Sequence, residues 1–297
     1  MKDTEPLVSI ILPSFNHESF IKENLTALEN IDYPNLELLI CDDGSTDGTR
    51  ELILERRNIL KEKFKRLEIL FPEHKGLKNS LNSLIRIASG KYIFTLASDD
   101  VIFPLTIKKL VSFLEVNSEY VLAVGDNNFI DNNSQKIRLH YNGDRISTMG
   151  EKFRLLPGME NENKFGDYFF LLRGNNVPNG YLVRRSAYDM AGEYVFELED
   201  WGMNLQLSKV GKFKFFPEVM FSYRIHGKNT ILSDSYQKRI KSFYLDVYRR
   251  EFGFNLLQGN IFLYLASFVR YVLIRFYMPK SLRKNLKRFC TYPPCPA

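Results

Sequence analysis

The sequence of 297 residues contains three cysteines and lacks the glycine-rich motifs that cradle phosphates. Cys41 lies in an apolar run typical of a core, and Cys290 and Cys295 have the wrong number and spacing for a zinc site of their own. No G-x-G-x-x-G follows the first strand-like run, and G-x-x-x-x-G-K-[ST] is absent throughout. This argues against a dinucleotide-dependent oxidoreductase and a P-loop NTPase. A bound diphosphate would have to be held by a metal ion and side chains.

The first residues also lack the features of an export signal. Met1–Pro6 is polar, and the apolar run Leu7–Leu12 is too short for an export segment. Together with the few cysteines, this predicts a cytoplasmic chain with free thiols.

The net charge of +6 is unevenly distributed along the chain. Residues 237–297 contain 12 basic and 2 acidic side chains, whereas the remainder contains 29 basic and 33 acidic ones. Nucleic-acid binding usually requires a basic patch on the folded body, so we expect no nucleic-acid partner. A basic tail rich in apolar residues is more typical of contact with an anionic membrane surface.

Strand-like and helix-like segments alternate over the first half of the chain. This alternation predicts right-handed βαβ units, a mostly parallel sheet flanked by helices, and therefore an α/β fold. The predicted strands are residues 8–12, 36–41, 67–71 and 92–96, and the predicted helices are residues 18–29, 52–59, 77–88 and a segment after Pro104.

The alternation ends near Tyr120. We expect a fifth strand at Tyr120–Gly125 and a hairpin turn at residues 131–133. Arg145–Gly166 has little periodicity and is interpreted as a mobile loop. A helix is expected after Asp200, and a pair of strands around Phe213–Tyr223.

The C-terminal segment has a different pattern. Ile261–Met278 is strongly apolar, but its polar side chains fall on one helical arc that includes Arg270 and Arg275. Two arginines at mid-span are costly in a bilayer-crossing helix, so a helix lying in the membrane interface fits better. The alternative is a helix that packs on the rest of the chain or on a second subunit. We predict a domain over residues 1–230, with halves at about 1–125 and 126–230, and a basic amphipathic helical extension over 231–297.

Polar clusters directly follow three of the predicted strands. They are Pro13–Asn16, Asp42–Ser45 and Ser98–Asp100. In doubly wound sheets, ligands bind beyond the carboxyl ends of the strands, so these clusters should share one edge. Two acidic pairs there would repel each other unless a cation compensates, and oxygen ligands suit Mg²⁺ or Mn²⁺. The alternative is helix capping, which is the better interpretation for Asp47.

Six segments of the chain carry recognisable motifs, at residues 8–16, 41–49, 75–93, 97–100, 199–201 and 223–229. They occur in the order found in glycosyltransferase family 2, and the sequence resembles that family over about residues 7–230. The resemblance implies the GT-A fold, a Rossmann-like arrangement, and inverting sugar transfer from a nucleotide-sugar donor with Mn²⁺ or Mg²⁺ as cofactor.

The resemblance assigns a role to each matched residue. Asp200 is expected to be the general base that takes the proton of the acceptor hydroxyl. Asp99, Asp100 and His226 are expected to hold the metal ion. The residues expected to bind the nucleotide, the sugar or the acceptor are Pro13, Ser14, Phe15, Asn16, Asp42, Asp43, Lys75, Asn82, Asp99, Glu199, Trp201 and Arg224.

One position departs from the family pattern, and several alternatives stay open. Many relatives carry an acidic residue where this chain has Ala97. The alternative that the chain is a binding or scaffold protein without catalysis therefore stays open. Trp201 could belong to the core instead of the acceptor site. A nucleotidyltransferase should show a glycine- and arginine-rich phosphate loop after the first strand, and Ser14–Glu18 shows none.

Together with the basic tail, the resemblance implies a place in bacterial surface polysaccharide assembly. The expected acceptor is a glycan or a lipid-linked glycan. The expected location is the cytoplasm, peripheral to the inner face of the cell membrane.

Overall fold

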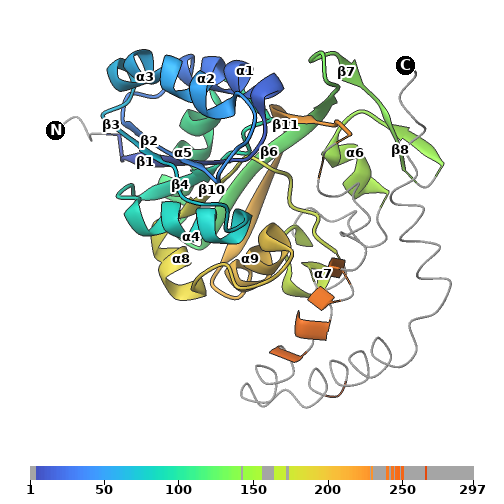
Figure 1. Ribbon diagram of the computed structural model, residues 1–297. Helices are drawn as coiled ribbons and strands as arrows, with labels where there is room; N and C mark the ends of the chain where they lie inside the picture. Colours follow the sequence, from blue (N-terminus) through green and yellow to red (C-terminus); the bar gives the residue numbers. More distant parts are fainter. Residues whose placement is uncertain are drawn as a thin grey trace.

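The computed structural model describes residues 5–141, 143–155, 164–171, 174–227 and 229, together with 239–240, 242–243, 245–247, 249–250 and 265. Its centre is a mixed sheet that is covered by helices on both faces (Figure 1). In spatial order the strands are β3 (Arg66–Leu70), β2 (Leu36–Asp42), β1 (Val8–Ser14), β4 (Tyr92–Thr95), β10 (Tyr181–Arg184), β6 (Tyr120–Ile130), β11 (Lys212–Arg224) and β5 (Val101–Ile102), with β7 (Lys136–Ile137) beside β6.

The first strands pair as the sequence predicts. β1 is parallel to both β2 and β4, and β2 is parallel to β3. β10 is antiparallel to its neighbours β4 and β6, whereas β6 and β11 are parallel. A small separate sheet is formed by β8 (Leu139–Tyr141) and β9 (Asp144–Ile146).

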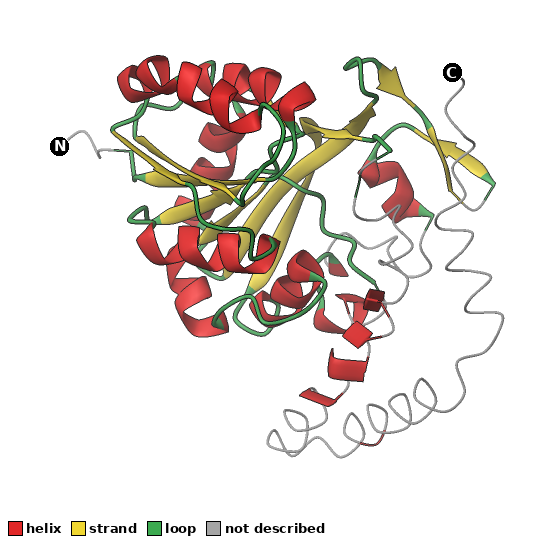
Figure 2. Ribbon diagram, viewed as in Figure 1, coloured by secondary structure: helices red, strands yellow, loops and turns green. Residues whose placement is uncertain are grey.

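Both faces of the sheet are covered, which explains the continuous apolar runs of its central strands. Alternate residues of β1 enter different clusters: Ile10 packs with α1 and α5, and Ile11 packs with α4. Figure 2 shows helices above and below the strands. The helices on the first face are α1 (Glu18–Glu29), α2 (Thr49–Glu55), α3 (Arg57–Lys63) and α5 (Thr106–Val116). Those on the second face include α4 (Leu77–Ile87), α8 (Arg185–Ala191) and α9 (Glu199–Leu207).

The strand pair expected around Phe213–Tyr223 is wrong, because β11 is one strand of 13 residues. Its pairing with β6 shifts register between Phe216 and Val219, and Pro217 lies in that interval. A bulge tolerates proline and bends the strand without ending it. β6 likewise extends to Ile130, beyond the expected end at Gly125, so Asp126 lies in a buried strand.

The loop expected over Arg145–Gly166 contains a helix, α6 (Met149–Arg154). Thr148 accepts a hydrogen bond from the backbone N–H of Glu151 at 3.2 Å, and Glu151 accepts one from the N–H of Ser147. This pair of bonds resembles a capping box in which the glutamate bonds to the residue before the N-cap, and it explains why a short helix begins there. The described residues that follow include a further short helix, α7 (Tyr168–Leu171).

The segment after residue 238 contributes to the core where it is described. Ile240, Phe243 and Val247 are buried in the cluster that contains Trp201. Apart from Leu265, the amphipathic segment Ile261–Met278 lies outside the described residues. None of the helices within the described ranges is long and apolar enough to cross a membrane.

Candidate functional site

The predicted polar clusters meet at one edge of the sheet. Ser14 pairs with Asp42 at the carboxyl ends of β1 and β2, and β4 runs parallel to β1 toward the same edge. β10 is antiparallel to β4, so its first residue, Tyr181, also starts at this edge. Residues from both halves of the chain are therefore brought to one location.

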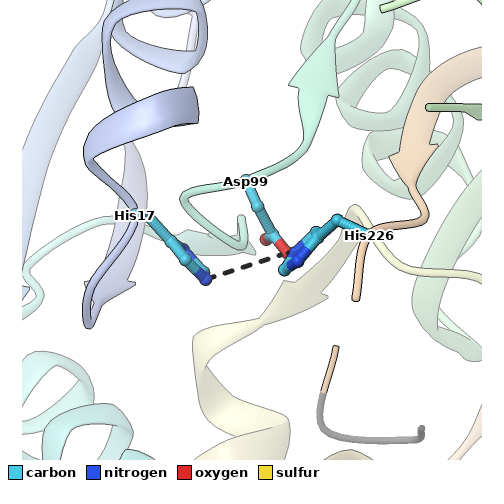
Figure 3. Close-up of side chains that lie close together, drawn as sticks. All are labelled: His17, Asp99 and His226. Atoms are coloured by element: carbon cyan, nitrogen blue, oxygen red, sulfur yellow. Dashed lines mark hydrogen bonds and ion pairs between the residues drawn. The ribbon is translucent and has the colours of Figure 1, made fainter. Parts of the chain in front are cut away.

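At this edge Asp99 lies between two histidines, His17 and His226, as Figure 3 shows. Oδ2 of Asp99 is 3.0 Å from Nε2 of His226 and 4.0 Å from Nε2 of His17. One potential ligand atom from each residue lies within 4.8 Å of the others. The three side chains come from the loops after β1 and β4 and from the segment after β11, which meet only in the folded chain.

The pKa values of the two neighbouring aspartates shift in opposite directions. Burial by itself would raise the pKa of Asp99, but the hydrogen bond with His226 and the charges of both histidines lower it. Burial and the adjacent charge of Asp99 raise the pKa of Asp100 well above its usual value. A nearby cation would favour the charged form of both carboxylates. An imidazole and carboxylate set of this kind fits a divalent metal ion.

Asp100 does not belong to the cluster of Asp99 and the histidines. Its Oδ1 atom accepts a hydrogen bond from the backbone N–H of Arg224 at 2.8 Å. Its Oδ2 atom is buried and has no hydrogen-bond partner within the described part of the chain. The metal-ligand role of Asp100 therefore stays a prediction.

Arg224 is fully buried and bound to protein groups. Nε donates to the carbonyl of Asp99 at 2.7 Å, Nη1 to the carbonyl of Asp131 at 2.8 Å, and Nη2 to Glu23 at 2.6 Å. These bonds fix the loop that carries Asp99 to the hairpin between β6 and β7. In this structure Arg224 positions the acidic loop, and its expected role in binding the nucleotide, the sugar or the acceptor stays a prediction.

A second group of predicted residues surrounds the loop after β2. Asp43 accepts hydrogen bonds from the backbone N–H groups of Lys75 at 2.9 Å and Gly76 at 2.8 Å. His74 contacts the same carboxylate through Nδ1 at 2.9 Å, and its ring stacks on Phe15 with centroids 4.4 Å apart. Since Phe15 is 40% exposed, the stack offers a flat aromatic surface to a ligand.

Asn16 and Asp42 shape the backbone of this region. Asn16 adopts a φ of 54°, and its side chain accepts a hydrogen bond from the N–H of Thr46 at 2.8 Å. Asp42 is buried and accepts from the N–H and hydroxyl of Ser45. Pro13 and Ser14 lie buried at the end of β1. These residues hold the loops in place beside the exposed ring of Phe15.

Asp200 lies in the first turn of α9, where the helix dipole favours a negative charge. The hydroxyl of Tyr181 donates to its Oδ1 atom at 3.3 Å. Burial raises the pKa of Asp200, and the hydrogen bond from Tyr181 opposes that rise. A partly buried carboxylate with a raised pKa suits a general base.

Three further predicted residues have structural contacts. Glu199 forms an ion pair with Arg239 at 2.9 Å, so the segment after residue 238 reaches the first turn of α9. The Trp201 ring packs on Phe243, and its Nε1 donates to the carbonyl of Leu171, which favours the core alternative. Asn82 bonds to both the N–H and the carbonyl of Tyr194.

Sequence reasoning missed four residues at this edge: His17, His74, Tyr181 and Tyr194. His17 and His74 lie in polar loop sequence, which carries no periodic signal. The hydroxyl of Tyr194 is 3.5 Å from that of Tyr181, which in turn contacts Asp200. Only the pairing of β10 with β4 and β6 brings Tyr181 to this edge.

Comparison with known proteins finds relatives that match most of the chain. The model of the family described as glycosyl transferase family 2 matches residues 9–177, more than half of the chain. An uncharacterized glycosyltransferase of Haemophilus influenzae is 29% identical over 229 residues, which are 76% of this chain and 67% of that protein. Chondroitin synthase of Escherichia coli is 27% identical over 76% of this chain, which spans only 30% of the synthase.

Two solved structures share the fold. S. aureus TarS 1–349 in complex with UDP-GlcNAc has a TM-score of 0.58 at 17% identity, covering 81% of this chain and 66% of that one. The mannosyltransferase PcManGT from Pyrobaculum calidifontis, in complex with GDP-Man and Mn²⁺, has a TM-score of 0.61 at 14% identity. That match covers 98% of this chain and 82% of the mannosyltransferase. At these identities the likeness shows the GT-A fold.

Proposed function

The chain belongs to glycosyl transferase family 2 and is a glycosyltransferase, and we propose that it transfers a sugar with inversion from a nucleotide-diphosphate sugar to an acceptor hydroxyl. The observation that carries this proposal is the shared sheet edge of the Asp99 cluster and Asp200. The Asp99 cluster can bind the donor diphosphate, while Asp200 can act on the acceptor.

The donor side is supported by the loops after β1 and β2. The stacked rings of Phe15 and His74 offer a surface for a nucleobase, beside the turn held by Asp43. Asp99 and His226 would hold a divalent cation, with Asp100 next to them in the chain. Bound there, such an ion stabilises the negative charge that develops on a departing nucleotide diphosphate.

The acceptor side is supported by Asp200. Its carboxylate is held by Tyr181, and its raised pKa brings it closer to neutral pH, where a base is most effective. Asp200 would take the acceptor proton as the hydroxyl attacks the sugar. A single displacement of this kind inverts the anomeric centre, and a retaining double displacement would need a further positioned nucleophile.

We also propose a setting in bacterial surface polysaccharide synthesis, with a glycan or lipid-linked acceptor. The support is a relative named chondroitin synthase and the basic, apolar composition of residues 237–297. That composition would suit peripheral contact with an anionic membrane.

The proposal is tested by incubating the full chain with a panel of nucleotide sugars, with Mn²⁺ or Mg²⁺ and again with EDTA. We expect metal-dependent release of one nucleotide diphosphate, which Asp99→Asn and Asp100→Ala diminish. Binding of a donor that is indifferent to metal and to both substitutions would contradict the metal-dependent mechanism. Donor binding without any release would favour a scaffold protein that has lost catalysis.

A further inference from the structure

We propose that His17 is a third ligand of the metal ion, so that two imidazoles and one carboxylate hold it and the site prefers transition-metal ions to Mg²⁺. The inference rests on the metal dependence proposed above and adds a residue that the sequence did not identify. His17 lies in the loop after β1, which otherwise serves the nucleotide side of the site.

The distances between the three side chains are compatible with their binding one shared metal ion. Two protein atoms that share a first-row metal ion at about 2.1 Å lie roughly 3 to 4 Å apart. The Asp99 carboxylate is 3.0 Å from Nε2 of His226 and 4.0 Å from Nε2 of His17. All three ligand atoms lie within 4.8 Å of one another, so small side-chain movements suffice to bring them onto one ion.

The orientation of His17 is fixed by its other ring nitrogen. Nδ1 lies 2.7 Å from the hydroxyl of Ser98, the residue directly before Asp99. Metal-binding histidines commonly bond through the second nitrogen to a neighbouring oxygen, which sets the tautomer and the direction of the ring. Ser98 therefore leaves Nε2 of His17 directed at Asp99.

The backbone of His17 is also held. Its N–H donates to Thr49 at 2.9 Å, and its carbonyl accepts from the N–H groups of Phe20 and Ile21 in the first turn of α1. Its side chain is only 22% exposed, and its ring lies edge-on to His226 with centroids 5.8 Å apart. The surrounding contacts therefore hold His17 in place, unlike a solvated surface histidine.

The ligand set predicts which ion binds. Mg²⁺ favours oxygen ligands and keeps several waters, whereas imidazole nitrogens favour transition ions. Ala97 offers no side-chain ligand, and Asp100 bonds to the backbone of Arg224. The imidazole of His17 then contributes a donor that no carboxylate supplies, and shifts selectivity toward Mn²⁺ and Co²⁺.

The test is calorimetric titration of the full chain with Co²⁺, Mn²⁺ or Mg²⁺ alone, together with the visible absorption spectrum of bound Co²⁺. We expect His17→Ala to weaken Co²⁺ binding at least about tenfold, to change the Co²⁺ spectrum, and to affect Mg²⁺ much less. His17→Gln retains a polar side chain for Ser98 but no imidazole, and should behave like His17→Ala. His140→Ala, which removes an exposed histidine of β8, is the matched control and should bind as the wild type does.

The outcomes separate this inference from the proposed function. If both His17 variants melt as the wild type does and keep its Co²⁺ affinity and spectrum, while Asp99→Asn loses binding, His17 is no ligand and the metal site proposed above stands. If Asp99→Asn also binds normally, the metal site itself is refuted. An unchanged ratio of Co²⁺ to Mg²⁺ affinity in His17→Ala would equally overturn the selectivity argument.

Discussion

The hydroxyl of Tyr181 lies 3.3 Å from the Oδ1 atom of Asp200 and donates a hydrogen bond to it. Tyr181 is the first residue of β10, and Asp200 lies in the first turn of α9, so the contact joins the sheet edge to the helix that carries the proposed base. The bond favours the charged carboxylate and opposes the rise in pKa that burial causes.

Tyr181→Phe should therefore change the pH dependence of sugar transfer. Without the hydroxyl, the pKa of Asp200 rises further, and because a base must be unprotonated, the acidic limb of the pH–rate profile moves to higher pH. The measurement is nucleotide release against pH, using the donor found by the panel. An acidic limb in Tyr181→Phe that coincides with that of the wild type would show that Tyr181 does not tune Asp200.

Glu37 gives a prediction about stability. It is buried, and although burial would raise its pKa, hydrogen bonds from Ser9, Ser89 and Arg66 lower it. A group whose pKa is lowered on folding stabilises the native state above its unfolded value of 4.5, and this contribution disappears as pH falls through the folded value.

Glu37→Gln should accordingly lose about 2 kcal/mol of unfolding free energy at pH 7, and the difference from the wild type should shrink below pH 4.5. Urea unfolding at a series of pH values measures this difference in unfolding free energy. Glu68→Gln is the matched control, because Glu68 is exposed and pairs with the same arginine. If the loss of unfolding free energy stayed constant down to low pH, the effect would be due to packing.

The basic residues after Pro279 give a prediction about membranes. Truncation before residue 240 would remove the buried side chains Ile240, Phe243 and Val247, so charge neutralisation is the cleaner change. Replacing Lys280, Arg283, Lys284, Lys287 and Arg288 by glutamine should weaken binding to anionic vesicles by about 1 kcal/mol per residue. Cosedimentation with anionic and neutral vesicles measures it, and equal binding by both forms would refute membrane contact through this segment.

The strands and helices of the first half could be predicted because their sequence signals are local. The helix expected at Glu18–Glu29 has those bounds in the structure. The hairpin after β6 was also predicted, and Phe129 pairs with Ile137 across it. Asp131 accepts hydrogen bonds from two backbone N–H groups in that turn, as its sequence suggests.

The rest depends on contacts between distant segments. Pro217 resembles a strand break in the sequence, and only the register shift against β6 shows that β11 continues through it. His17 meets Ser98 across 81 residues because β1 and β4 are parallel neighbours. Trp201 could not be assigned from its helix alone, since its packing partner Phe243 lies in a different segment. The edge of the site was therefore predictable, and so were Asp99 and His226, whereas the position of His17 beside them was not.

The central claim is that Asp200 performs the chemistry while other residues bind the donor. The most direct measurement compares wild type with Asp200→Asn for two quantities: affinity for the donor in the presence of metal, and the rate of nucleotide release. We predict unchanged donor affinity and a rate lower by about 10²- to 10⁴-fold, because general-base catalysis contributes on that order. A variant that turns over at the wild-type rate would contradict the claim, and so would one that no longer binds the donor.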